Sequence, residues 1–246
     1  MFKGTQKKGG VTKKKGSPKW RNALTEIETL TKRISKESPQ PGTLYYKYKQ
    51  DDASKTDKSN KPSKRKVVDT TDKSLIKIRF SDLPISRATI NGLQKAKFIK
   101  MTEVQRASIP HALSGTDIVA CARTGSGKTL CYLISIIECL YKKRWSMMDG
   151  LGALILVPTR ELAMQAFEVL RSFATLHDIS AALVIGGKDL EMEREHIQNM
   201  NILIATPGRL LQHMDETFTF DGSSLQMLVI DEVDRILDMG FKQSVD

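Results

Sequence analysis

Short apolar runs alternate with segments of helical periodicity from Phe80 onward. The runs are rich in branched residues and bounded by Gly, Pro or polar residues, at 117–122, 152–158, 181–186, 201–206 and 225–231. Between them, apolar residues recur at helical spacing over 127–143, 159–176, 188–199 and 207–215. Strands that alternate with helices predict βαβ units and a buried parallel sheet. The pattern therefore predicts an α/β fold, in which ligands bind at the carboxyl ends of the strands.

The N-terminal part of the chain has a different composition. Two stretches, KKGGVTKKKGSPK and DDASKTDKSNKPSKRK, are rich in Lys, Ser, Gly and Pro, which predicts disorder. Between them, apolar residues at positions 20, 23, 24, 27, 30 and 34 have helical spacing and predict one amphipathic helix over 20–37. We therefore expect a basic, mostly disordered tail over 1–75 and a folded domain over 76–246.

The positive charge belongs to this tail. Residues 1–79 hold 22 Lys and Arg against 8 Asp and Glu, a net charge of +14, and the remaining residues hold 17 against 20, a net charge of −3, which together give the +11 of the whole chain. The run KPSKRK at 61–66 fits nuclear import or RNA tethering, and it fits a solvated linker equally well.

The chain carries no sign of secretion or of a membrane segment. Its three cysteines, Cys121, Cys131 and Cys139, have no CxxC spacing, which is typical of reduced thiols in a nuclear or cytosolic protein. The first residues lack the apolar core of a signal peptide. The apolar runs are too short to cross a bilayer, so no membrane association is expected.

A phosphate-binding loop follows the first predicted strand and opens a helix. Residues 122–129 fit the P-loop pattern, with Ala122 at its first glycine position: Ala122, Arg123, Thr124, Gly125, Ser126, Gly127, Lys128 and Thr129. Small residues let backbone N–H groups face phosphates at a helix N-terminus. Lys128 is expected to reach the β- and γ-phosphates of a bound nucleotide, and the Thr129 hydroxyl to bind Mg²⁺. The alternative is a glycine-rich turn before a core helix.

The last predicted strand ends in acidic residues. Mg²⁺ prefers carboxylate and water ligands, so Asp231 is a candidate metal ligand, acting through water. Glu232 could orient and polarise an attacking water molecule. Taken alone, these acids would also suit a helix N-terminus, where the dipole favours negative charge.

These motifs together resemble the first RecA-like domain of the DEAD-box RNA helicases, over residues 80–246. The resemblance implies a RecA-like P-loop parallel sheet flanked by helices, with ATP and Mg²⁺ as cofactors and RNA as partner. FSDLPIS, IGGKDLE and TPGRLLQHMDET are closest to a nucleolar branch that acts on small-subunit pre-ribosomal RNA. It thus implies ribosomal RNA processing in the nucleus, at the nucleolus.

The resemblance also assigns roles to residues outside the phosphate loop. KFIKMTEVQ resembles the Q motif, in which Phe98 would stack on adenine, Gln105 would read its edge, and Thr102 lies between them. Lys97 and Met101 stand where Gly and Pro are usual in the family. Without the resemblance, this stretch would be interpreted as a helix start. The residues that match the RNA-contacting motifs are Pro158, Thr159, Arg160, Gly187, Thr206, Pro207, Gly208 and Arg209. Such contacts hold the sugar–phosphate backbone and read no base sequence.

Two departures from the family pattern stand out. Val233 replaces the usual Ala in the acidic motif, which would cost about 1–3 kcal/mol if the position is packed. No Ser-Ala-Thr follows Asp234, and nothing resembles the second RecA-like domain, so the sheet is expected to be incomplete at its C-terminal end. We therefore expect these 246 residues to bind ATP–Mg²⁺ weakly, with negligible hydrolysis and no unwinding on their own.

Two other functions stay open on the sequence alone. A non-catalytic RNA-binding or regulatory form would use the basic tail and half of the RNA site. An unrelated P-loop kinase or GTPase would recognise its base by residues other than Phe98 and Gln105, and guanine would then compete with adenine for the pocket.

Overall fold

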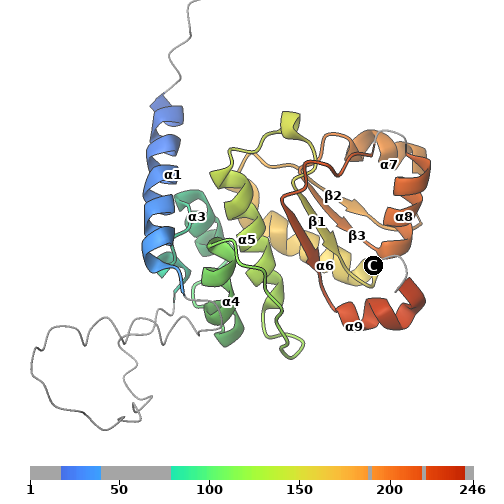
Figure 1. The fold of residues 1–246 in the computed structure, drawn as a ribbon, viewed down its shortest axis with the longest axis horizontal. Coiled ribbons are helices and arrows are strands. Elements are labelled where there is room, and N and C mark those ends of the chain that lie inside the picture. The colour runs from blue at the N-terminus through green and yellow to red at the C-terminus, as the bar shows by residue number, and fades with distance from the viewer. Residues whose placement is uncertain (1–17, 40–78, 188–189, 218–219, 242–246) are drawn as a thin grey trace, which may run out of the picture.

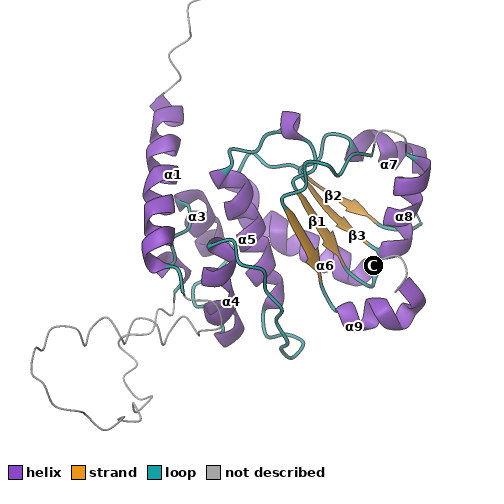
Figure 2. Ribbon diagram, viewed as in Figure 1, coloured by secondary structure: helices purple, strands orange, loops and turns teal. Residues whose placement is uncertain are grey.

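The computed structural model describes residues 18–39, 79–187, 190–217 and 220–241. Their centre is a parallel four-stranded sheet with the order β2-β3-β1-β4 (Figure 1). Its strands are β1 (Ala153–Leu156), β2 (Ala181–Val184), β3 (Ile202–Ala205) and β4 (Met227–Ile230). Helices cover the sheet, so the predicted α/β architecture is confirmed (Figure 2).

The helices form two groups, one on each face of the sheet. The first group comprises α3 (Arg87–Lys95), α4 (Glu103–Leu113), α5 (Lys128–Lys142) and α6 (Arg160–Phe173). The second comprises α7 (Leu190–Ile197), α8 (Pro207–Glu216) and α9 (Val233–Ile236), the last followed by the π-helical turn η5 (Leu237–Phe241). Three short 3₁₀ turns complete the elements: η2 (Phe80–Asp82), η3 (Met147–Asp149) and η4 (Ala174–Leu176).

The central strands bury both faces, which explains why their sequences are continuously apolar. In β3, Ile202 and Ile204 join the core under α3–α6, whereas Leu203 and Ala205 join the core under α7–α9. Side chains alternate between the faces of a strand, so a strand covered on both sides needs apolar residues at every position. Each of the four predicted helical segments between the apolar runs also holds a helix, namely α5, α6, α7 and α8.

The first predicted strand, 117–122, does not form. This segment has no strand structure, and Val119 is fully exposed, at 103% of its reference area. A strand needs a neighbour that accepts and donates backbone hydrogen bonds, and no described segment pairs with 117–122 as a strand. Apolar composition reveals which residues favour a strand, but it cannot show whether a neighbouring strand is there to receive them.

The predicted N-terminal helix is confirmed as α1 (Pro18–Glu37), which lies against α3 and α5 (Figure 1). Leu30 is buried, and Ile34 packs against the core under α3–α6. The Glu26 carboxylate accepts hydrogen bonds from the Arg87 backbone N–H at 2.7 Å and from the Tyr141 hydroxyl at 2.9 Å. The predicted disorder of 1–17 and 40–75 lies outside the described residues.

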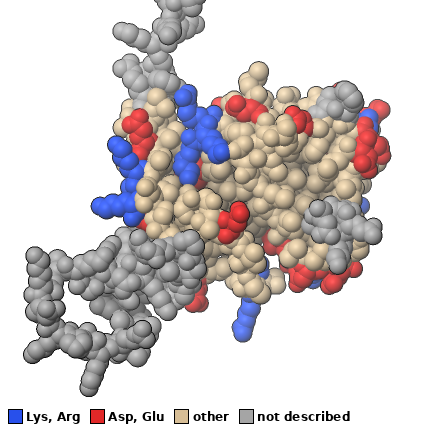
Figure 3. Space-filling model, in the orientation of Figure 1, with Lys and Arg blue, Asp and Glu red and all other residues tan. Residues whose placement is uncertain are grey.

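Charged side chains are unevenly distributed on the face seen in Figure 3. Lys and Arg gather around α1, whereas Asp and Glu dominate the side that carries α7. Within the described part of the chain, no helix has both the length and the apolar character that a membrane crossing requires.

Candidate nucleotide and RNA site

The predicted functional residues lie along one edge of the sheet, where its parallel strands end. Following the strand order, Gly187 comes after β2, Thr206 after β3, Thr159 after β1 and Asp231 after β4. The N-terminus of α5, which carries the phosphate loop, lies at the end of the molecule where β4 runs into α9 (Figure 1). The RNA-type motifs therefore follow the three adjacent strands β2, β3 and β1, and the acidic motif follows β4, the outermost strand on the side of β1.

The phosphate loop turns sharply at two glycines and leads into α5. Gly125 and Gly127 have φ values of +79° and +92°, a left-handed conformation that side chains disfavour. Lys128 is the first residue of α5, and its ammonium group donates to the carbonyl oxygens of Ala122, at 2.5 Å, and Arg123, at 3.3 Å. The loop thus curls around the cation at the N-terminus of a 15-residue helix, an arrangement that attracts anions.

One polar atom inside the loop lacks a hydrogen-bond partner that a ligand group could supply. The Ser126 hydroxyl is buried and has no hydrogen-bond partner among the described residues. Buried hydroxyls are nearly always paired, and a bound phosphate would supply an acceptor. Together with the two left-handed glycines and Lys128, this unpaired hydroxyl fits a loop that binds the phosphates of a nucleoside triphosphate.

Gln105 connects the Q-motif segment to the phosphate loop. Thr102 is the N-cap of α4, and its backbone N–H donates to the Gln105 side-chain oxygen at 2.8 Å, as in half of a capping box. The Gln105 amide nitrogen donates to the Gly127 carbonyl at 3.0 Å. A Cβ on Gly127 would lie 2.4 Å from that nitrogen, so only glycine fits there. Gln105 therefore takes part both in the start of α4 and in the contact with the phosphate loop, so this stretch is a helix start and part of the predicted site at once.

Phe98 follows a helix ending whose geometry normally calls for glycine. Lys97 has a φ of +64° directly after α3, its N–H donates to the Gln94 carbonyl, and the Phe98 N–H donates to the Leu93 carbonyl. These two bonds define a Schellman motif. The Phe98 ring packs partly against the core and borders a small cavity of about 50 Å³.

The acidic motif is fixed by hydrogen bonds at both carboxylate oxygens of Asp231. Its Oδ1 accepts the Glu232 backbone N–H at 3.0 Å, and its Oδ2 accepts the Tyr132 hydroxyl at 3.1 Å. Glu232 has a φ of +49° and pairs with the Arg235 guanidinium at 3.1 Å. Tyr132 lies one helical turn after Lys128, so the hydroxyl bond brings Asp231 beside the start of α5.

Sequence reasoning missed Tyr132, although its spacing from Thr129 and Lys128 puts it on their face of α5. Burial raises the pKa of Tyr132, the Asp231 charge raises it further, and a hydrogen bond with the Thr129 side chain opposes both. The hydroxyl therefore stays protonated between the two predicted magnesium ligands, Thr129 and Asp231. Among the described residues, no group of three or more His, Cys, Asp and Glu side chains could hold a metal. Thr129 and Asp231 provide one hydroxyl and one carboxylate. These two groups suit Mg²⁺, which is usually held by one or two carboxylates together with phosphate and water.

Both predicted RNA-contacting threonines occupy the N-cap positions of helices. Thr159 is the N-cap of α6, and its hydroxyl accepts the Leu162 N–H at 3.3 Å. Thr206 is the N-cap of α8, whose first residue is Pro207, a residue that suits this position because the first helical N–H has no partner within the helix. Pro158 and Pro207 are buried, whereas Gly208 is exposed at the surface. Both helix starts thus present backbone N–H groups at the strand ends.

Arg160 and Arg209 differ sharply in their surroundings. The exposed Arg160 lies over the glycine pair after β2: a Cβ on Gly186 or Gly187 would come within 3.0 or 2.8 Å of its guanidinium nitrogens. The Arg209 side chain is only 8% exposed, and its Nε donates to the Glu193 carboxylate at 2.7 Å. His213 contacts the same carboxylate oxygen at 2.9 Å. Arg209 therefore joins α8 to α7, with its charge already paired.

Val233 shows no sign of the packing strain that a buried site would cause. Its side chain is 46% exposed in the first turn of α9. With nearly half of the side chain exposed, the two extra methyl groups relative to Ala are not enclosed and should cost little.

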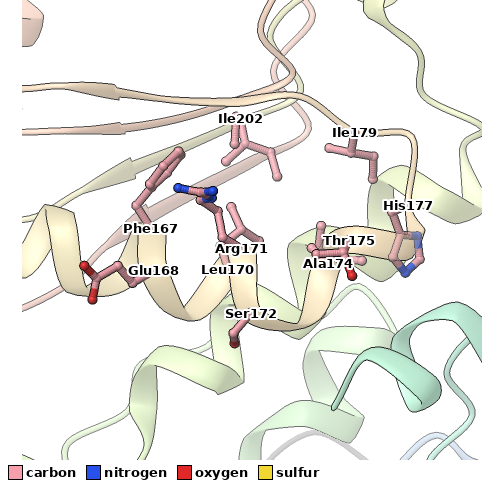
Figure 4. A pocket seen from close by; sticks show the side chains of 12 residues that line it. Phe167, Glu168, Leu170, Arg171, Ser172, Ala174, Thr175, His177, Ile179 and Ile202 are labelled. Carbon is pink, nitrogen blue, oxygen red and sulfur yellow. The ribbon is translucent and has the colours of Figure 1, made fainter. Parts of the chain in front are cut away.

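A larger groove lies away from all these residues. It has a volume of about 540 Å³ and runs beside the C-terminal half of α6, with Phe167, Arg171 and His177 on its walls (Figure 4). Its floor includes Ala181 and Ile202, the first residues of β2 and β3. It therefore lies at the amino end of the sheet, opposite the predicted site.

The fold and this strand-end arrangement define an α/β domain with a P-loop. The family described as DEAD/DEAH box helicase matches residues 102–246. The chain belongs to this family.

Similar proteins include relatives that are named as ATP-dependent RNA helicases. The chain is 56% identical over 178 residues to ATP-dependent RNA helicase DBP4 of Yarrowia lipolytica, covering 72% of this chain and 24% of that protein. It is 57% identical over 168 residues to the human probable ATP-dependent RNA helicase DDX10, covering 68% of this chain and 19% of that protein. The chain thus spans about a quarter or less of the length of these relatives.

A solved structure supports the fold. The crystal structure of a DEAD box protein from the hyperthermophile Methanococcus jannaschii has a TM-score of 0.63 and 35% sequence identity to this chain, covering 68% of this chain and 45% of that one. The RecA-like interpretation of the sheet is thereby confirmed.

Proposed function

We propose that this chain is the ATP-binding portion of an ATP-dependent RNA helicase, in which residues 76–246 bind ATP–Mg²⁺ and half of an RNA backbone site. Residues 122–129 would hold the phosphates, and Phe98, Thr102 and Gln105 would hold the adenine. Thr129 and Asp231 would hold the metal ion. The names of the relatives, ATP-dependent RNA helicases DBP4 and DDX10, support this choice over a P-loop kinase or GTPase.

The observation that carries the proposal is the bond between Tyr132 and Asp231. It joins the helix that begins at Lys128 to the acid after β4, across the 99 residues that separate Tyr132 from Asp231. A phosphate loop alone, or an acidic helix start alone, has common structural explanations. Their juxtaposition at one sheet edge supports a shared ligand with both phosphate and metal.

Three residues are proposed to take part in hydrolysis. Lys128 would neutralise the transferring phosphate, Asp231 would orient metal-bound water, and Glu232 would orient the attacking water. Bound Mg²⁺ would supply positive charge that stabilises the developing negative charge on the phosphate oxygens. The Arg235 guanidinium, paired with Glu232 at 3.1 Å, would help to align that carboxylate.

The RNA backbone is proposed to lie across the ends of β1, β3 and β2. Its phosphates would meet the helix starts at Thr159 and Thr206 and the Arg160 guanidinium beside Gly187. Pro158, Pro207 and Gly208 would shape these turns, and Arg209 would contribute by holding α8 in place through Glu193. The basic tail over 1–75 would add sequence-independent attraction to RNA.

We further propose that the RNA is pre-ribosomal and that the protein works in the nucleus, at the nucleolus. The motifs FSDLPIS and TPGRLLQHMDET, together with the DBP4 and DDX10 relatives, support this branch of the family.

Nucleotide binding by the purified chain tests the central proposal. A fluorescent ADP analogue with Mg²⁺ should bind the wild type and be displaced by ATP better than by GTP. Lys128→Ala should weaken this binding by roughly tenfold or more, because a charged hydrogen bond to phosphate contributes about 1.5–3 kcal/mol. Lys142→Ala is the matched control, since Lys142 lies at the other end of α5. Equal displacement by GTP, or equal binding by Lys128→Ala, would contradict the proposal.

A further inference from the structure

Tyr132 lies at the proposed site without contacting the nucleotide or the RNA in the scheme above. Its ring packs against the core under α3–α6, which fixes the direction of the hydroxyl. That hydroxyl donates to Asp231 Oδ2 at 3.1 Å. Tyr132 lies three residues after Thr129 on α5, so its side chain links the helix that carries one proposed magnesium ligand to the other ligand.

We propose that Tyr132 is a positioning residue for the magnesium ion, through the orientation that its hydroxyl imposes on the Asp231 carboxylate. This inference rests on the proposed function, because it concerns the same metal ion. Tyr132 itself does not bind the metal. It acts through the carboxylate that does.

The two bonds to Asp231 explain why the hydroxyl matters. The Glu232 N–H holds Oδ1 from the backbone, and the Tyr132 hydroxyl holds Oδ2 from α5. With one oxygen held, a carboxylate can still turn about its last torsion, which has a broad energy minimum. With both held, its plane is set. Each oxygen keeps a lone pair for metal-bound water, since a carboxylate oxygen can accept two hydrogen bonds.

The bond also ties the two halves of the metal site to each other. Thr129 belongs to α5, and Asp231 follows β4, which among the described residues is an edge strand paired with β1. An edge strand with one neighbour has less to hold its end in place than a central strand. The Tyr132 hydroxyl spans the gap between these elements, so the spacing of the two ligands depends on it.

Tyr132→Phe tests the proposal because it removes the hydroxyl and keeps the ring. Affinity for a fluorescent ADP analogue would be measured over a series of free Mg²⁺ concentrations and in EDTA. We expect the Mg²⁺ concentration at half-effect to rise roughly tenfold, since loss of a group that orients a metal ligand costs about 10- to 100-fold in metal affinity. Affinity in EDTA should stay at the wild-type value, because the loop that holds the phosphates is intact.

Two further variants separate a positioning role from a loss of packing. Tyr141→Phe is the matched control: it removes another hydroxyl from α5, the one bonded to Glu26, and should leave the Mg²⁺ dependence unchanged. In an Asp231→Asn background, Tyr132→Phe should cause no additional loss, because the carboxylate it orients is gone. Thermal melting would establish that each variant is folded.

The outcomes distinguish this inference from the proposed function. An unchanged Mg²⁺ dependence in Tyr132→Phe would overturn the inference, and so would an equal loss of affinity in EDTA and in Mg²⁺. Wild-type protein that binds the nucleotide with no response to Mg²⁺ would overturn the proposed function, and the inference with it.

Discussion

Lys97 is one of three described non-glycine residues with a positive φ, a conformation that side chains disfavour. It occupies the left-handed position of the Schellman motif after α3, with a φ of +64°. Glycine is the usual residue there because it lacks the Cβ that makes this conformation unfavourable. The glycine that the resemblance to the Q motif leads one to expect at this position thus has a physical reason. The chain keeps the motif despite the lysine, and with it the direction of the backbone into Phe98.

Lys97→Gly should therefore stabilise the protein. Relief of the left-handed strain is worth about 1–2 kcal/mol, and the greater freedom of glycine in the unfolded chain takes back about 0.5–1 kcal/mol. The net gain should be about 0.5–1 kcal/mol in the free energy of unfolding, measured by urea denaturation. Lys97→Ala is the control and should give no gain, since alanine keeps the Cβ. A loss of stability in Lys97→Gly would contradict this account.

At the scale of elements, Arg160 begins the helix that follows β1, and its guanidinium lies against the glycine pair that follows β2. Gly187 has a φ of +94°, and a Cβ there would lie 2.8 Å from Arg160 Nη1. A side chain at this position would strain the backbone and displace the guanidinium from the proposed RNA face. The turn after β2 thus sets the position of a charge that belongs to α6.

Gly187→Ala should weaken RNA binding beyond its effect on stability. Gly115→Ala is the matched control, because Gly115 has a similar φ of +83° and a Cβ there would meet nothing within 4 Å. Both substitutions should lower stability by about 1–2 kcal/mol through left-handed strain. Only Gly187→Ala should reduce the affinity for single-stranded RNA, measured by fluorescence anisotropy with an ATP analogue present. Equal RNA affinities for the two variants would argue against a role of Arg160 at this surface.

The elements also show what could be predicted from sequence. The continuous apolar runs of β1–β4 and the periodic segments of α5–α8 were sufficient to predict these strands and helices, because burial leaves a strong local pattern in the sequence. The run at 117–122 has the same pattern and stays exposed, since pairing depends on a neighbour that is remote in sequence. Tyr132 and Glu193 escaped notice for a related reason: their importance comes from contacts to Asp231 and Arg209 made only in the fold.

At the scale of the whole molecule, a polar network connects α1 to the helix that carries the phosphate loop. Glu26 of α1 accepts the Tyr141 hydroxyl, and the Tyr141 ring meets His177 edge-on at 5.5 Å. His177 Nε2 lies 2.9 Å from the Thr89 hydroxyl, which donates to the buried Glu138 carboxylate of α5. Four segments that are far apart in sequence thus share one network.

This network should make stability depend on pH through His177. Burial lowers the pKa of His177 to about 4 from its ordinary 6.5, although the nearby Glu26 charge acts in the opposite direction. The folded protein therefore binds fewer protons than the unfolded chain between these values. The stability contributed by neutral His177 is fully present above pH 6.5 and is lost as the pH falls toward 4, by up to about 3 kcal/mol.

His177→Gln isolates this effect, because glutamine can still donate to Thr89 and does not titrate. The titration of Glu138 is the reason for comparing two proteins. Burial raises the pKa of Glu138, so the stability that this group contributes is lost as the pH rises through its folded-state pKa. This effect is opposite in sign to that of His177. Both variants retain Glu138, so its effect cancels in the difference. Urea denaturation from about pH 7 to about pH 4.5 should show wild type losing more stability than His177→Gln. Parallel curves for the two proteins would mean that folding does not shift the pKa of His177.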